Sequence, residues 1–199
     1  KTAINQRFGT AGQRCTASQK LFIHESIYDA FRIKLVEETK KLVVGDPMKK
    51  ETFVGPVVST SAADEIMRRL EQAVNMGAKV LAGNKREGNI IHPTIVENLE
   101  IQCDLIREET FGPVLPLMKF STLDEVLEQL KSSAFGLQAG VFTNDLRIIK
   151  RLYEELEVGA LAVNDGPGFR AEHFPFGGTK ESGMGREGVA YAIREMSAV

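Results

Sequence analysis

The residue best suited to covalent chemistry is Cys15, which lies in the segment Ala11-Gly-Gln-Arg-Cys-Thr-Ala17. The adjacent Arg14 places a fixed positive charge beside the thiol, and a neighbouring cation favours the thiolate, which is the nucleophilic form. A small buried residue is the commoner role of an arbitrary cysteine, so the residues alone leave both interpretations open. Cys103 lies in Ile101-Gln-Cys-Asp-Leu105 without a basic neighbour, and we expect it to be an inert core residue.

A second group with possible chemistry is the pair of carboxylates Glu108 and Glu109, which precede a strand opening with glycine and proline. Paired acids before a sheet edge can bind ribose hydroxyls or act as acid and base, although most such pairs are solvated loop residues. The segment Gly183-Met-Gly-Arg-Glu-Gly188 matches the dinucleotide fingerprint by letter, but it follows no apolar strand, so we interpret it as a loop. No metal site is predicted, because the histidines share no ligand spacing. These are His24, His92 and His173.

Composition limits the possible partners. The chain has 199 residues, a net charge of −2 and no cluster of basic residues, so nucleic acid and membrane surfaces are not expected partners. No apolar run approaches the roughly 20 residues that a membrane span needs. Two cysteines in unlike contexts indicate a reducing compartment, and we expect a cytoplasmic protein. The first residue is Lys1 rather than methionine, so we expect the chain to be part of a longer protein.

Apolar spacing predicts an alternating order of helices and strands that would position these residues. Gly12 is expected to end the first helix and Ser26 to cap the second. Helices are predicted at 3–12, 26–45, 61–77, behind a capping box at 122–125, at 146–156 and at 189–196. Strands are predicted at 20–24, 78–82, 92–96, 114–120, 138–143 and 160–164. The strand–helix–strand unit at 138–164 favours parallel pairing, so we predict one α/β domain with a largely parallel sheet covered by helices.

Four segments, in order, resemble the catalytic domain of the aldehyde dehydrogenase superfamily. The first, Phe8-Gly-Thr-Ala-Gly-Gln-Arg-Cys-Thr-Ala17, resembles the nucleophile signature, and Glu108-Glu-Thr-Phe-Gly-Pro-Val114 resembles the tract that holds the nicotinamide ribose. Leu137-Gln-Ala-Gly-Val-Phe-Thr143 resembles the sheet strand after it, and Pro175-Phe-Gly-Gly-Thr-Lys-Glu-Ser-Gly-Met-Gly-Arg-Glu187 resembles the substrate-side loop and following turn. The resemblance spans nearly all of the chain and implies a three-layer α/β/α sandwich.

The resemblance also implies roles for individual residues. Cys15 is expected to attack the aldehyde carbon, giving a thiohemiacetal and then a thioester, with its own main-chain N–H as half of an oxyanion hole. Glu109 is expected to bind the ribose hydroxyls of NAD or NADP, with Phe111 against the nicotinamide end. Asn164, at the end of the last sheet strand, is expected to order the loop that faces the substrate.

The substrate class is suggested by two arginines and a histidine. Gln-Arg-Cys at Arg14, together with Arg170 and His173 before Pro-Phe-Gly-Gly, looks like family members that oxidise lactaldehyde, glyceraldehyde 3-phosphate, succinate semialdehyde or phosphonoacetaldehyde. Guanidinium groups bind carboxylate or phosphate bidentately, so we expect a small anionic or hydroxylated aldehyde. The alternative is that Arg14 pairs with a local acid and Arg170 is solvated.

Several parts of the family pattern are expected to lie outside this chain. They are the upstream Leu-Gly-Gly-Lys-type segment with the general base, the coenzyme-binding domain, the oxyanion asparagine and the C-terminal oligomerisation strand. We therefore expect little turnover from this chain alone and a homo-dimeric or homo-tetrameric parent enzyme. Two other interpretations of the residues are a cysteine-dependent hydrolase or acyltransferase and a non-catalytic interaction domain.

Overall fold

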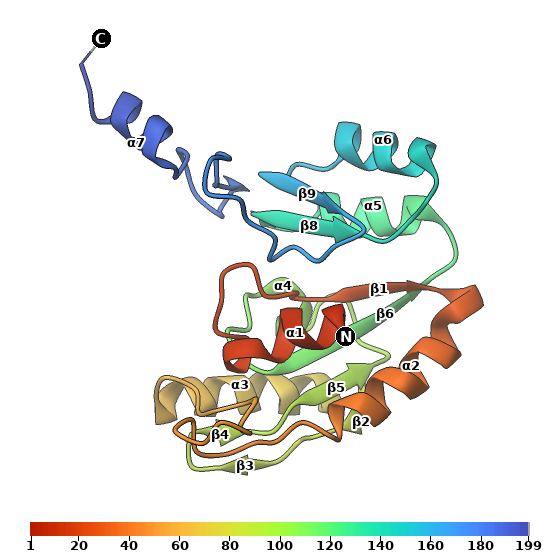
Figure 1. Cartoon of the computed structure of the whole chain (residues 1–199). Helices are drawn as coiled ribbons and strands as arrows, with labels where there is room; N and C mark the ends of the chain where they lie inside the picture. Colours follow the sequence, from red (N-terminus) through yellow and green to blue (C-terminus); the bar gives the residue numbers. More distant parts are fainter. Residues whose placement is uncertain (199) are drawn as a thin grey trace. The chain divides into compact units, whose positions relative to one another are not determined.

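The chain divides into two compact units, Lys1–Leu123 and Asp124–Val199, in the computed structural model (Figure 1), which describes residues 1–198. Cys15 and the paired acids belong to the first unit, and the 164–188 loops belong to the second. Among the described residues, no helix is both long enough and apolar enough to cross a membrane.

The first unit is built on a four-stranded sheet with the order β1-β6-β5-β2. The strands are β1 (Leu21–His24), β6 (Val114–Phe120), β5 (Thr94–Glu97) and β2 (Lys79–Ala82). β6 pairs in parallel with both β1 and β5, whereas β2 is antiparallel to β5. β6 has the predicted bounds, and the other three strands lie within two residues of their predicted starts. The prediction of a largely parallel sheet is confirmed here.

Helices and short elements complete the first unit. The helices are α1 (Thr2–Phe8), the 3₁₀ turn η1 (Gly9–Gly12), α2 (Glu25–Thr39), α3 (Thr60–Asn75) and α4 (Asp104–Arg107). A small hairpin joins β3 (Arg86–Glu87) to β4 (Ile90–Ile91), and neither it nor α4 was predicted. α3 begins where the sequence places it, with Ser59 Oγ accepting a hydrogen bond from the N–H of Ala62 at 3.1 Å.

Two details of α2 differ from the prediction. His24, rather than Ser26, is the N-cap, and its Nδ1 accepts a hydrogen bond from the N–H of Ser26 at 3.2 Å. The helix ends at Thr39 instead of continuing to residue 45. The carbonyl of Val43 accepts hydrogen bonds from the N–H groups of Phe53 and Val54, so this segment pairs with a neighbouring strand-like stretch and cannot extend the helix.

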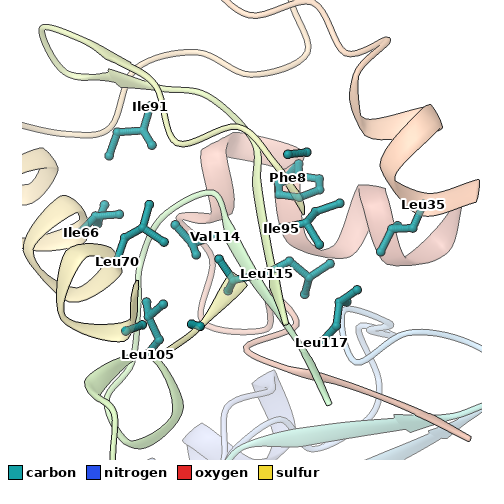
Figure 2. Packing of buried hydrophobic residues seen from close by; sticks show 14 of the residues in the cluster. Phe8, Leu35, Ile66, Leu70, Ile91, Ile95, Leu105, Val114, Leu115 and Leu117 are labelled. Carbon is teal, nitrogen blue, oxygen red and sulfur yellow. The ribbon is translucent and has the colours of Figure 1, made fainter. Parts of the chain in front are cut away.

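The hydrophobic core of the first unit lies between this sheet and its helices. Figure 2 shows side chains of α1, α3 and the sheet gathered in one cluster, which includes Phe8, Leu70, Ile95 and Leu115. Each of these four is essentially inaccessible to solvent. Full burial of one such side chain contributes about 1.5–3 kcal/mol, so this cluster supplies a large share of the driving force for folding.

The second unit contains the predicted strand–helix–strand. β8 (Gln138–Val141) pairs in parallel with β9 (Ala160–Val163), and the two are joined through α6 (Leu146–Glu155), as predicted. A further antiparallel pair, β7 (Phe135–Gly136) with β10 (Thr179–Lys180), was not predicted. The remaining helices are α5 (Leu123–Lys131) and α7 (Val189–Glu195), the latter within one residue of its expected bounds.

Candidate active site

Cys15 is exposed at the tip of a turn between η1 and β1. The N–H of Ala17 donates to the carbonyl of Arg14 at 3.0 Å, which closes a tight turn with the cysteine at its second position. Before this turn, Thr10, Ala11 and Gly12 all have positive φ, at 55°, 54° and 73°. A left-handed run that includes two non-glycine residues is energetically unfavourable, so surrounding contacts must hold it in place.

One of those contacts is a close approach of two main chains. A Cβ atom at Gly12 would lie 2.3 Å from the carbonyl oxygen of Gly112, which is why only glycine fits there. Gly112 lies three residues after Glu109, in the segment 108–112 that we call the acidic tract. The main chain leading to Cys15 therefore contacts the main chain of the acidic tract. Gly12 and Gly112, about 100 residues apart in the sequence, are therefore in direct contact.

The acidic tract is held from two further directions. Gln19 Nε2 donates to the carbonyl of Glu108 at 2.7 Å, and Arg69 Nη1 donates to the carbonyl of Glu109 at 2.7 Å. Arg69 is itself paired with Glu65 at 2.8 Å on α3. The Glu109 carboxylate and the Phe111 ring are both exposed, the latter to 44%. A rigid main chain therefore presents a carboxylate and an aromatic ring next to the cysteine loop.

Arg14 turns toward α1. Its Nη2 donates to the main-chain carbonyls of Asn5 at 2.9 Å and Gln6 at 3.2 Å, so its acceptors there are neutral and not a local acid. Its Nε is buried and has no hydrogen-bond partner among the described residues. The guanidinium is therefore fixed beside the cysteine turn by the end of a helix.

The three other predicted site residues belong to the second unit. Asn164 has φ of 57° and links the ends of the parallel pair: its Oδ1 accepts from the N–H of Thr143 at 3.0 Å, and its N–H donates to the carbonyl of Val141. These bonds join Asn164 to the end of β8. Arg170 lies 4.5 Å from the ring centre of Phe176 and 3.3 Å from the carboxylate of Glu187.

His173, in the same loop as Arg170, is exposed and contacts the ring of Phe174 edge-on, with centres 4.4 Å apart. The structure thus brings the Cys15 turn and the tract 109–111 together in the first unit, and it places Asn164, Arg170 and His173 on loops of the second.

The two cysteines differ as the sequence predicted. Cys103 is fully buried at the start of α4, and burial raises the pKa of its thiol above the ordinary value. A buried thiol with a raised pKa is a poor nucleophile at neutral pH. Within residues 1–198, no three His, Cys, Asp or Glu side chains lie close enough to hold a metal ion.

Sequence reasoning missed three residues that hold the site together: Arg7, Gln19 and Arg69. A signal was available for Arg7, because it is three residues after Ile4 and four before Ala11 and so shares the buried face of the first helix. Gln19 and Arg69 carry no such signal. Their acceptors are main-chain carbonyls about 90 and 40 residues away in the chain, at Glu108 and Glu109.

Comparison with known proteins identifies the family. The chain belongs to the aldehyde dehydrogenase family, whose model matches residues 1–199. It is 60% identical over 195 residues to a sulfoacetaldehyde dehydrogenase of Neptuniibacter caesariensis, covering 98% of this chain and 43% of that protein. It is 43% identical to a 3-sulfolactaldehyde dehydrogenase of Priestia aryabhattai, covering 98% of this chain and 41% of that protein.

Solved structures agree with this assignment. An aldehyde dehydrogenase of Physcomitrella patens in complex with the reaction product succinate superposes with a TM-score of 0.95 at 40% identity, covering 98% of this chain and 40% of that one. A glyceraldehyde-3-phosphate dehydrogenase of Methanocaldococcus jannaschii complexed with NADP also gives 0.95, at 38% identity, covering 99% and 43%. The predicted family and α/β fold are confirmed, and the chain spans about two fifths of the length of these relatives.

Proposed function

We propose that this chain is the catalytic domain of an NAD(P)-dependent aldehyde dehydrogenase and that Cys15 is its nucleophile. The observation that carries the proposal is an exposed thiol on a constrained turn, in main-chain contact with a tract that presents Glu109 and Phe111. Family membership favours this over a cysteine hydrolase or a non-catalytic domain, and neither alternative explains an exposed Glu109 carboxylate in the tract that contacts the cysteine segment.

The proposed chemistry follows from the thiol and its turn. The Cys15 sulfur adds to the carbonyl carbon of the aldehyde and forms a thiohemiacetal, and the Cys15 main-chain N–H donates to the oxygen that gains negative charge. When bound, the nicotinamide of NAD or NADP supplies the hydride acceptor. The thioester left on Cys15 is a good acyl donor, so water hydrolyses it to the carboxylic acid and restores the thiol.

The tract 109–111 has the donor set that a nicotinamide nucleotide requires. An ionised carboxylate accepts strong hydrogen bonds from two ribose hydroxyls, and we assign this role to Glu109. The partly exposed ring of Phe111 offers an apolar face to the nicotinamide end. Because Arg69 and Gln19 bind the carbonyls of this tract, its main chain is held before the nucleotide arrives, which lowers the entropic cost of orienting it.

For the substrate we propose a short aldehyde with an anionic group, in particular a sulfonate. The relative at 60% identity is named a sulfoacetaldehyde dehydrogenase, and the relative at 43% a 3-sulfolactaldehyde dehydrogenase. Arg14 is fixed by α1 directly before Cys15 in the sequence, and we propose that its positive charge contributes to binding the anion. We assign Arg170 and His173 to the substrate-side loop, and we propose that Asn164 orders this loop.

The specificity is tested by comparing kcat/KM of the full-length protein on sulfoacetaldehyde, succinate semialdehyde, lactaldehyde and hexanal. We expect the anionic aldehydes to exceed hexanal by at least about tenfold, which corresponds to about 1.4 kcal/mol of transition-state binding. Arg14→Ala should lower kcat/KM for the anionic aldehydes more than kcat/KM for hexanal. Faster turnover of hexanal, or unchanged kinetics of Arg14→Ala on the anionic substrates, would contradict the proposal.

The nucleophile assignment is tested by alkylation. Iodoacetamide followed by peptide mapping should label Cys15 and leave Cys103 unmodified, since only the first thiol is exposed. In the full-length protein Cys15→Ala should abolish aldehyde oxidation, while Cys103→Ala is the matched control and should retain it. Preferential labelling of Cys103 would refute the assignment.

We further propose a cytoplasmic enzyme that acts as a homo-dimer or homo-tetramer, with no nucleic acid or membrane partner. Two free cysteines and a net charge of −2 support this. At the end of the second unit, Val189, Ile193 and Met196 recur at helical spacing and are 78%, 56% and 80% exposed, as expected for a protein interface. We expect the chain alone to turn over aldehyde slowly at most, since its relatives are more than twice as long.

A further inference from the structure

A buried arginine lies behind the site and is not used in the chemistry described above. Arg7 is on the inner face of α1 with only 1% of its surface exposed, between the apolar residues Ile4 and Phe8. An apolar side chain would satisfy that position of the helix, and burying a charge is unfavourable unless it is well bound. The contacts of Arg7 therefore need a functional explanation.

Its guanidinium connects the two halves of the candidate active site. Nη1 donates to the carbonyl of Ser18 at 3.2 Å and to Oε1 of Gln19 at 3.3 Å, at the end of the cysteine loop. Nη2 donates to the carbonyl of Thr110 at 2.6 Å, in the acidic tract. A single planar group thus binds both the segment after Cys15 and the residue after Glu109.

All three of these acceptors are neutral, so the charge of Arg7 is not balanced by a direct ion pair with them. Burial lowers the pKa of Arg7 to about 9, while the charge of Glu109 opposes that change. The guanidinium therefore keeps its proton at pH 7, and its positive charge interacts with the exposed Glu109 carboxylate. The hydrogen bonds of Arg7 to the two segments come from its terminal nitrogens, Nη1 and Nη2.

We propose that Arg7 is a positioning residue that sets the spacing between the Cys15 turn and the Glu109 tract. This rests on the proposed function, in which Cys15 carries the acyl group and Glu109 orients the nucleotide. If the spacing between nucleophile and nucleotide is wrong, the reacting atoms are misaligned even though substrate and nucleotide still bind. The residue therefore acts on the rate of the chemical step through Cys15 and Glu109, without touching either ligand.

Two substitutions of Arg7 separate the positive charge of the guanidinium from its planar, two-pronged geometry. Arg7→Lys keeps a positive charge but replaces the rigid fork by a single ammonium, which cannot bridge both segments with the same geometry. Arg7→Met removes both charge and fork while retaining much of the side-chain volume. Arg68→Met is the charge-removal control, because Arg68 pairs with Glu65 and Asp104 on the surface of α3 and α4, and among residues 1–198 no hydrogen bond joins it to either segment.

The experiment uses the full-length protein and three readouts: kcat and KM for the aldehyde, the Kd for NAD or NADP in the absence of substrate, and the rate of Cys15 alkylation without nucleotide. Both Arg7 variants should lower kcat about tenfold to a hundredfold, because a misplacement of about 1 Å can have that effect, with a much smaller change in KM. They should also raise the nucleotide Kd severalfold and change the alkylation rate. Arg7→Lys should retain more nucleotide affinity than Arg7→Met.

Other outcomes overturn the proposal in distinct ways. Folded Arg7 variants with wild-type kcat, nucleotide Kd and alkylation rate would show that Arg7 only stabilises the fold. If Arg7→Met does not fold, Arg7→Lys decides by the same three readouts. If Arg68→Met shows equal losses, the effect is a general response to removing a positive charge. Retained oxidation in Cys15→Ala would instead refute the proposed function itself.

Discussion

The two units of the chain are stabilised in different ways. The hydrophobic core cluster draws all of its buried members from the first unit, between Ile4 and Met118. In the second unit, among the described residues, only four apolar side chains are buried: Val126, Leu127, Leu152 and Phe176. Cys15, the proposed nucleophile, therefore belongs to the unit with the larger buried core, whereas Arg170 and His173 belong to the unit with fewer buried apolar side chains.

The second unit relies on hydrogen bonds from side chains to the main chain. Lys180 Nζ donates to the carbonyls of Lys131 and Ser133, both at 3.0 Å, and Ser182 Oγ accepts from the N–H of Gly136 at 3.0 Å. These bonds fix the short β7–β10 pair, which is too small to hold together by packing. A fixed main chain around Cys15 suits covalent chemistry, in which the reacting atoms must be aligned.

The largest predicted change in the free energy of unfolding tests the difference in burial between the two units. Leu115→Ala, in the central strand β6, removes a fully buried side chain and should lower the free energy of unfolding by about 3–5 kcal/mol. Leu146→Ala is the matched substitution in the second unit, where the side chain is 77% exposed, and should change it by less than about 0.5 kcal/mol. Urea denaturation of the 199-residue chain measures both.

A comparable loss for Leu146→Ala would break the comparison, because it would mean that α6 is covered by another surface in solution. A small loss for Leu115→Ala would mean that the sheet of the first unit repacks easily. Either result would contradict the inference that Cys15 lies in the better packed of the two units.

Two glycine substitutions, with a smaller predicted change in the free energy of unfolding, test whether the tight packing of the first unit extends to the cysteine turn. Gly12 and Gly88 both have positive φ, at 73° and 62°, but only Gly12 approaches another main chain, and a Cβ at Gly88 would meet nothing within 4 Å. Gly88→Ala should cost about 1–2 kcal/mol for the left-handed conformation alone. Gly12→Ala should cost more and also alter the alkylation rate of Cys15, because its Cβ would displace the carbonyl of Gly112.

Equal losses of unfolding free energy for Gly12→Ala and Gly88→Ala, with unchanged alkylation, would show that the turn moves aside freely. The contact with the acidic tract would then be incidental, and the first unit would be rigid only in its core.

The same difference between the units explains what the sequence could predict. Strand β6 and the α6 crossover were predicted well, because continuous apolar runs and helical spacing report burial directly. In α3, Ile66 and Leu70 are buried as predicted, but Ala73 takes the place expected for Val74, which is 39% exposed. Helical spacing predicts a face and leaves its edges uncertain by about one residue.

Elements held by hydrogen bonds rather than by burial could not be predicted. β7 and β10 have two residues each, which is too short for any periodicity to appear. The cap of α2 was assigned to Ser26 because serine is a favoured cap, whereas the imidazole of His24 accepts the bond. For the candidate site, the residues marked the segments containing Cys15 and Glu109 as possibilities and the family resemblance suggested their roles, but the contacts that join these segments depend on the tertiary fold.

The smallest predicted change in the free energy of unfolding comes from the helix caps, which are a carboxylate in the second unit and a hydroxyl in the first. Asp145 caps α6 in the second unit, with Oδ1 accepting from the N–H of Arg147 at 2.8 Å, and Ser59 caps α3 in the first. Hydrogen bonds from Arg147 lower the pKa of Asp145 to about 2, below its unfolded value of about 3.9. Its stabilisation is therefore complete above about pH 4 and is lost as the pH falls through about 2.

Ser59→Ala should lower the free energy of unfolding by about 1 kcal/mol at every pH, because a hydroxyl does not titrate in this range. Asp145→Ala should destabilise the chain at pH 7, and the difference from the wild type should shrink between pH 4 and pH 2.5. Thermal unfolding at pH 7, 4, 3 and 2.5 measures both variants. A loss for Asp145→Ala that stays constant to pH 2.5, or one that grows as the pH falls, would show that the charge of this cap does not stabilise the second unit.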